Sequence, residues 1–154
     1  EFHATPYMQR YVLEALFIMG KAEEAVARMH RLYPTVMKDD CSTLWEHWDW
    51  SGTSNHAWTG GGATELGSRV AGITPVEPGY KVFRVNPQMG SLKKVEAGFD
   101  TVSGKIEVVL DRRGSRIEAV ITVPEGTCAI VRPAKAKSDQ ALGPGVHKVK
   151  LQSR

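Results

Sequence analysis

The sequence has little that would support a metal centre, a disulfide framework or a membrane span. Its 154 residues include two cysteines, Cys41 and Cys128, which fall in different predicted subdomains, and its five histidines lack the spacing of zinc ligands. No run of about 18 apolar residues is present, which excludes a transmembrane helix. We therefore expect two partly buried thiols, no metal, no cofactor and no membrane partner.

A strong excess of charge of one sign is also missing. The formal net charge is +3 at pH 7, from 20 Lys and Arg against 17 Asp and Glu, and the two signs are interspersed. The most basic stretch, residues 135–154, is typical of a solvated edge rather than of a nucleic-acid site. We expect no nucleic-acid partner. A hydrophobic content of 42% is sufficient for a real core.

The sequence begins Glu1-Phe2-His3 and shows no signal-peptide pattern. This beginning predicts a chain that starts inside a longer protein, with its localisation signals elsewhere.

The first third of the sequence predicts an αα-hairpin. Thr5 and Pro6 are typical of a helix N-cap and first turn, and Gly20 stands where a helix ends. A second amphipathic helix is predicted over residues 21–33 and is stopped by Pro34. Two helices joined tightly at Gly20 would lie antiparallel.

Apolar residues surround most of the first predicted helix, so we expect it to be buried on more than one side. Val12 and Leu16 keep helical spacing with one face, and Leu13 and Phe17 populate another. A truncated protein would expose this surface, which predicts self-association.

After a third predicted helix over residues 63–70, the apolar period changes from helical to alternating. Runs at residues 82–85, 106–110, 117–123, 128–131 and 146–151 predict short strands, with a hairpin turn at residues 112–115 and a loop at residues 133–145. The predicted fold class is α+β, with helices in residues 1–75 and an antiparallel β-sandwich of five to seven strands in residues 79–154.

The densest chemical signal lies between the helices and the strands. All four tryptophans fall within residues 45–58, and aromatic faces are natural platforms for sugar rings. Glu46 lies among them, where partial desolvation would raise its pKa and suit it to acid or base chemistry. The alternative is that the tryptophans only pack, with Glu46 and Asp49 satisfied by His47 or by the backbone.

Several ordered motifs closely resemble the end of the bacterial α-L-rhamnosidases of glycoside hydrolase family 78. The resemblance runs through nearly the whole chain and rests on Thr43-Leu44-Trp45-Glu46 followed by Trp48, Thr53-Ser54-Asn55-His56-Ala57-Trp58, Val70-Ala71-Gly72-Ile73, Glu77-Pro78-Gly79-Tyr80 and Asn86-Pro87-Gln88-Met89-Gly90.

The resemblance implies that the helices are the last ones of an (α/α)6 toroid, a six-hairpin glycosidase domain, followed by a C-terminal β-sandwich. It implies that Glu46 is the general base of an inverting hydrolysis and that His56 contacts the bound rhamnose. The expected ligand is a rhamnose-containing glycoside or polysaccharide. Enzymes of this kind are often exported, so a periplasmic or secreted protein is expected.

The remaining candidates for substrate binding are Trp45, Trp48, Trp58 and Asn55, where Asn55 would orient His56 or cap a turn. In the family the general acid lies upstream of this segment, and the carboxylates near Glu46 here are Asp39, Asp40, Asp49 and Glu65. We therefore expect this chain alone to be inactive.

Two alternatives remain open from the sequence. The chain could be a carbohydrate-binding or structural module that holds sugar without cleaving it. It could also belong to a six-hairpin glycosidase that acts on another sugar.

Overall fold

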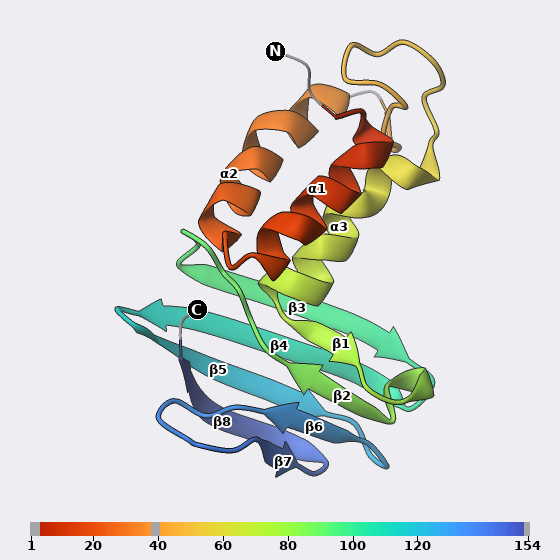
Figure 1. Ribbon diagram of the computed structural model, residues 1–154. Coiled ribbons are helices and arrows are strands. Elements are labelled where there is room, and N and C mark those ends of the chain that lie inside the picture. The colour runs from red at the N-terminus through yellow and green to blue at the C-terminus, as the bar shows by residue number, and fades with distance from the viewer. Residues whose placement is uncertain (1–3, 38–40, 153–154) are drawn as a thin grey trace. The chain divides into compact units, whose positions relative to one another are not determined.

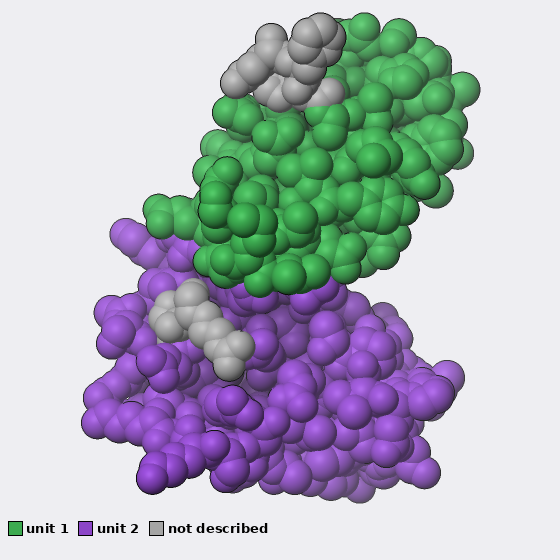
Figure 2. Space-filling model, in the orientation of Figure 1, with its two compact units in different colours: residues 1–66 green, residues 67–154 purple. Residues whose placement is uncertain are grey.

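The computed structural model describes residues 4–37 and 41–152, and it divides into two compact units, Glu1–Leu66 and Gly67–Arg154 (Figure 2). Asp39 and Asp40, two of the carboxylates considered above, lie outside the described residues. The predicted domains are 1–75 and 79–154, whereas the first unit ends at Leu66 and the second begins at Gly67.

Helix α1 (Pro6–Ile18) begins and ends as its sequence predicts. The Thr5 hydroxyl accepts a hydrogen bond from the Met8 amide at 3.4 Å, and Pro6 occupies the first turn, where a missing N–H costs nothing. Gly20 follows the helix with a φ of +74°, a conformation that favours glycine.

Helix α2 (Ala22–Leu32) lies beside α1 and continues into a 3-10 turn, η1 (Tyr33–Val36), which confirms the predicted αα-hairpin (Figure 1). The two helices bury apolar side chains of Leu13, Phe17, Ala25, Val26, Met29 and Leu32. Helix α1 contacts both α2 and α3, and its buried residues are Pro6, Gln9, Leu13 and Phe17. At its end, Ile18 and the following Met19 stay 69% and 66% exposed.

The third helix starts earlier than predicted and changes its winding along its length. It consists of a 3-10 turn η2 (Ala57–Gly60), a short α-helix α3 (Gly61–Glu65) and a π-turn η3 (Leu66–Val70). α3 lies alongside α1 (Figure 1). Gly62 faces the Tyr33 ring so closely that a Cβ atom would lie 2.6 Å from Cζ, so the glycine run permits close helix packing.

The second unit contains two four-stranded sheets. The first has the strand order β1-β2-β6-β7 and the second the order β3-β4-β5-β8. Their bounds are β1 (Ile73–Pro75), β2 (Val82–Val85), β6 (Cys128–Val131) and β7 (Gln140–Leu142), and β3 (Lys94–Thr101), β4 (Gly104–Arg113), β5 (Arg116–Val123) and β8 (Gly145–Gln152). A 3-10 turn η4 (Pro78–Tyr80) precedes β2.

Side chains from both sheets form one hydrophobic core. Phe83 of β2, Ile106 of β4, Ile121 of β5 and Ala129 of β6 are each fully buried in it. The strands β4 and β5 alternate buried and exposed residues and are joined at Gly114, as the hairpin prediction requires. The α+β class and a two-sheet second half are therefore confirmed.

Seven of the described strands, β2 to β8, lie within residues 79–154, where five to seven were predicted. One detail of the predicted sandwich is wrong. The pairing is not wholly antiparallel, since β2 and β6 run parallel with Val82 opposite Cys128. Between β2 and β6 the chain forms β3, β4 and β5 of the other sheet, and this long connection allows β6 to run parallel to β2.

Cys41 and Cys128 are both half-buried thiols. Among the described helices, none combines the length and the apolar character that crossing a membrane requires.

Candidate functional site

The tryptophan-rich segment forms a loop that doubles back on itself between η1 and η2. The Glu46 amide donates to the Thr53 carbonyl at 2.9 Å, and the His56 amide donates to the Leu44 carbonyl at 3.2 Å. Within the loop, Trp50 adopts a φ of +64°, which is uncommon for a large side chain. These backbone contacts bring Glu46 and Thr53 opposite each other although they are seven positions apart in the sequence.

Indole groups anchor this loop to the helices of the first unit. The Trp48 Nε1 donates to the Ala4 carbonyl at 2.7 Å, and the Trp50 Nε1 donates to the Thr35 carbonyl. The Trp48 ring also meets Tyr33 edge to face, with centroids 5.7 Å apart. Two of the four tryptophans therefore hold the loop in place through both apolar and polar contacts.

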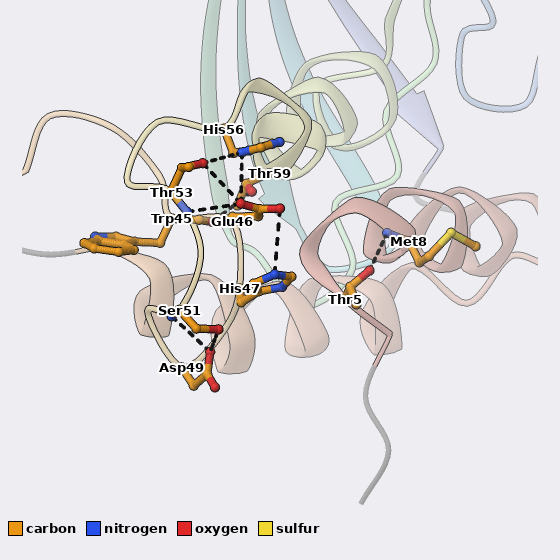
Figure 3. Close-up of polar contacts among 10 residues, drawn as sticks. All are labelled: Thr5, Met8, Trp45, Glu46, His47, Asp49, Ser51, Thr53, His56 and Thr59. Carbon is orange, nitrogen blue, oxygen red and sulfur yellow. Dashed lines mark hydrogen bonds and ion pairs between the residues drawn. The ribbon is translucent and has the colours of Figure 1, made fainter.

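The carboxylate of Glu46 is the centre of the polar contacts in the loop (Figure 3). Its Oε2 accepts hydrogen bonds from the Thr53 amide at 3.1 Å and from the Thr53 hydroxyl at 3.2 Å. The Nδ1 of His56 lies 3.4 Å from the same oxygen, and the Nε2 of His47 lies 3.7 Å from Oε1. The side chain is 20% exposed, so solvent still reaches it.

These contacts lower the pKa of Glu46. The Thr53 amide is the largest cause, desolvation opposes it, and the Thr53 hydroxyl and the two histidines act in the same direction as the amide. The expectation that desolvation raises this pKa is therefore wrong in sign, because hydrogen bonds to the charged form outweigh burial. A carboxylate held ionised can accept a proton but is poorly suited to donate one.

His56 joins the carboxylate to an aromatic surface. Its Nδ1 lies 2.6 Å from the Thr53 hydroxyl oxygen, and its ring lies on Trp58 with centroids 3.9 Å apart and planes inclined by 38°. Trp58 in turn contacts Tyr7 of α1 at a centroid distance of 5.0 Å. Trp58 is 44% exposed, so one face of this aromatic group is open to solvent.

The structure brings together three of the six predicted site residues, namely Glu46, His56 and Trp58. The Trp45 indole points away from the Glu46 carboxylate (Figure 3), and its carbonyl accepts a hydrogen bond from the Thr59 hydroxyl at 2.9 Å. Trp48 makes the anchoring contacts described above. Asn55 is exposed beside His56. Roles for all six residues in binding or catalysis stay predictions.

Two residues of the site, Thr53 and Gly52, were not singled out as candidates from the sequence, and His47 was named there only as a partner that could satisfy Glu46 and Asp49. Thr53 lies three residues before His56 in the same motif, and the Ser51-Gly52 dipeptide is a turn signal. Gly52 has a φ of +79°, and a Cβ atom there would lie 2.5 Å from Oε2 of Glu46. The turn signal could have located the reversal, but not its closeness to the carboxylate.

The other carboxylates near this loop are engaged elsewhere. Asp49 accepts hydrogen bonds from the Ser51 hydroxyl at 2.7 Å and the Ser51 amide at 3.1 Å, and these two contacts lower its pKa. Glu65 is buried in α3. The titratable side chains that act on the pKa of Glu46 are both histidines. No cluster of three potential metal ligands occurs in residues 4–37 and 41–152.

Comparisons with known proteins agree with this architecture. Residues 72–147 match the family model of the bacterial alpha-L-rhamnosidase C-terminal domain. No curated protein sequence matches the chain. The Glu46 loop precedes the matched segment.

Three solved structures share the fold over most of the chain. A native α-L-rhamnosidase from Aspergillus terreus is 24% identical with a TM-score of 0.74, covering 90% of this chain and 18% of its own. An α-L-rhamnosidase from Dictyoglumus thermophilum is 19% identical with a TM-score of 0.76, and the match covers 94% of this chain and 20% of that enzyme. A Streptomyces avermitilis α-L-rhamnosidase complexed with L-rhamnose is 20% identical with a TM-score of 0.69, and the match covers 94% of this chain and 17% of that enzyme.

The chain thus spans about a fifth of the length of these enzymes, and at such identities the likeness establishes the fold. The family match and the shared fold together confirm the resemblance to the bacterial α-L-rhamnosidases that the sequence motifs indicated. Over residues 72–147, just under half of its length, the chain matches the family of bacterial α-L-rhamnosidase C-terminal domains.

Proposed function

We propose that this chain is the C-terminal part of an inverting glycoside hydrolase of the α-L-rhamnosidase kind, in which Glu46 is the general base. One observation carries the proposal: Thr53 donates two hydrogen bonds to the Glu46 carboxylate, at 3.1 and 3.2 Å, and lowers its pKa. A general base must be ionised and reachable by water. Glu46 meets both requirements, being 20% exposed.

In this mechanism a water molecule attacks the anomeric carbon while Glu46 takes its proton. The bond from the anomeric carbon to the departing oxygen breaks, and a separate acid protonates that oxygen. His56 and Trp58 supply a polar edge and an aromatic face on which a sugar ring can lie. The substrate we propose is a rhamnose-containing glycoside or polysaccharide.

An inverting site needs a second carboxyl group roughly 6.5 to 9.5 Å from the base. Asp49 is held by Ser51, and the titratable side chains that act on the pKa of Glu46 are histidines, so no partner acid is identified among the described residues. We therefore propose that the acid lies elsewhere in a longer protein. The helices α1, α2 and α3 would complete the (α/α)6 toroid of that protein. The 154-residue chain alone would not hydrolyse rhamnosides.

The test is the rate of the full-length parent on an aryl α-L-rhamnoside, with Glu46→Gln beside wild type. Loss of a general base should reduce turnover by about 10²- to 10⁴-fold. Asp49→Asn is the matched control, because it removes a carboxylate of the same loop that faces Ser51, and it should retain turnover. A Glu46→Gln enzyme with near wild-type rates would overturn the proposal, as would turnover by the 154-residue chain itself.

A second function, sugar binding without cleavage, is favoured by the exposed aromatic rings. Trp58 and Tyr7 are 44% and 43% exposed. Tyr7 contacts Trp58, and Trp58 contacts His56, which suits a carbohydrate-binding surface. Calorimetric titration of the chain with L-rhamnose and rhamnosides distinguishes the two. If the Glu46→Gln chain still binds the sugar and the Glu46→Gln parent still hydrolyses its substrate, this loop binds sugar and Glu46 has no part in cleavage.

A further inference from the structure

Three polar atoms meet in a triangle at the centre of the candidate site. Thr53 Oγ1 and His56 Nδ1 are 2.6 Å apart, Thr53 Oγ1 and Glu46 Oε2 are 3.2 Å apart, and His56 Nδ1 and Glu46 Oε2 are 3.4 Å apart. Figure 3 shows the three side chains turned toward one another. Because the contacts share their atoms, the position of one proton constrains the others.

The hydroxyl of Thr53 has a single proton to donate, and an ionised carboxylate has none. If this proton pointed at His56, Nδ1 would be an unprotonated acceptor. The lone pairs of Nδ1 and of the hydroxyl oxygen would then both face the negative Oε2, at 3.4 and 3.2 Å. Two of the three contacts would be repulsive.

The opposite arrangement satisfies all three contacts. The hydroxyl of Thr53 donates to Glu46, and the Nδ1–H of His56 donates to the hydroxyl oxygen and leans toward the carboxylate. The Thr53 amide, 3.1 Å from Oε2, adds a further donor that keeps the carboxylate ionised and accepting.

We infer that Thr53 is a positioning residue that fixes neutral His56 as its Nδ1–H tautomer, so that Nε2 is presented to the sugar as a hydrogen-bond acceptor. Figure 3 shows the second ring nitrogen of His56 on the side of the imidazole away from Thr53. No described residue forms a hydrogen bond with this nitrogen.

The consequence concerns which sugar groups the site selects. A neutral imidazole with a free Nε2 accepts a hydrogen bond from a hydroxyl, whereas the other tautomer would donate one. The site would then favour a ring whose hydroxyl group points its proton at His56. This role in substrate selection rests on the proposed function, but the tautomer itself does not.

The test is a long-range proton–nitrogen correlation spectrum of the 154-residue chain, recorded at alkaline pH, where an ordinary imidazole is neutral. Unprotonated and protonated ring nitrogens differ widely in chemical shift, and His56→Gln identifies the signals. We expect an unprotonated Nε2 in wild type and in Thr53→Ser, which keeps the hydroxyl. Thr53→Val should show a larger share of the Nε2–H form, because 3.4 Å to Glu46 exceeds an ordinary hydrogen bond.

His47 provides an internal reference, since it contacts the other carboxylate oxygen and should keep its signals in Thr53→Val. A wild-type spectrum with Nε2 protonated would overturn the inference, and that spectrum is decisive even if Thr53→Val does not fold. A Thr53→Val spectrum identical to wild type would show that Thr53 does not fix the tautomer of His56. Neither result depends on turnover, so this inference and the general-base proposal fail separately.

Discussion

The backbone of Gly52 passes so close to Glu46 that a Cβ atom on Gly52 would lie 2.5 Å from Oε2 and 3.0 Å from Cδ. The same atom would lie 3.0 Å from Cδ2 of His47. Gly52 therefore belongs to the wall of the candidate site, and its lack of a side chain leaves room for the carboxylate and its donors.

Gly52→Ala should displace the Glu46 carboxylate and weaken its contacts with Thr53. Gly20→Ala is the matched control, because Gly20 has a similar φ of +74° and a Cβ atom added there would meet nothing within 4 Å. Both variants carry a backbone cost of about 1 kcal/mol. Only Gly52→Ala should also shift the NMR signals of Glu46, Thr53 and His56; unchanged signals would contradict the close approach.

The pH dependence of Glu46 follows from its lowered pKa. A carboxyl group whose pKa is lower in the folded state than in the unfolded state stabilises the fold at pH values above its unfolded-state pKa. This stabilisation is lost as the pH falls through the folded-state pKa, which for Glu46 is lowered. We expect Glu46 to titrate below its ordinary value of 4.5 in a carboxyl carbon NMR titration. Thr53→Val should move the midpoint upward, since it removes one donor and keeps the amide.

The Thr53→Ser variant should titrate like wild type, because it retains the hydroxyl. A wild-type midpoint at or above 4.5 would show that desolvation, and not hydrogen bonding, dominates at this carboxylate.

The two-sheet core should be sensitive to the truncation of a single buried side chain. Val108 is fully buried between the sheets, whereas Val102 in the turn between β3 and β4 is 93% exposed. Val108→Ala should lower the free energy of unfolding by about 2 to 3 kcal/mol, and Val102→Ala by less than about 0.5 kcal/mol. Urea unfolding of both variants measures the difference; equal losses would be inconsistent with this core.

Self-association is predicted from the exposed apolar side of α1. Ile18 and Met19 are 69% and 66% exposed, and Tyr11 on the same helix is 47% exposed. Sedimentation velocity at increasing concentration should show association, and Ile18→Glu should reduce it. Val102→Glu, at an exposed position of the second unit, is the control that should leave it unchanged. A monomer at all concentrations would count against the prediction.

The parts of the fold that sequence predicts well are those set by neighbouring residues. Thr5, Pro6 and Gly20 mark the limits of the first helix because capping depends on a few adjacent backbone groups. The hairpin of β4 and β5 follows from alternation and a tight turn at Gly114. The parallel pairing of Val82 with Cys128 has no such local signal, since it depends on where the chain returns.

The candidate site divides in the same way. The motif places Glu46 and His56 in one loop, but the pKa of Glu46 depends on Thr53, which meets it only after the chain reverses. That reversal includes Trp50 at a φ of +64°, a conformation that its side chain disfavours and that its indole contact with Thr35 helps to hold. Sequence patterns do not predict such a conformation, so the sign of the pKa shift could not be obtained from them.

The pairing of β2 with β6 also determines the order in which the second unit can be completed during synthesis. Strands β1 and β2 leave the ribosome first, yet one edge of β2 stays unpaired until β6 emerges, and β5 stays unpaired on one side until β8 follows. Unpaired edges are templates for association with other chains. A nascent or truncated chain that stops before β6 would therefore leave β2 and β5, which are interior strands of the completed sheets, each with an open edge. Such a chain should depend on chaperones to a degree that the completed chain does not.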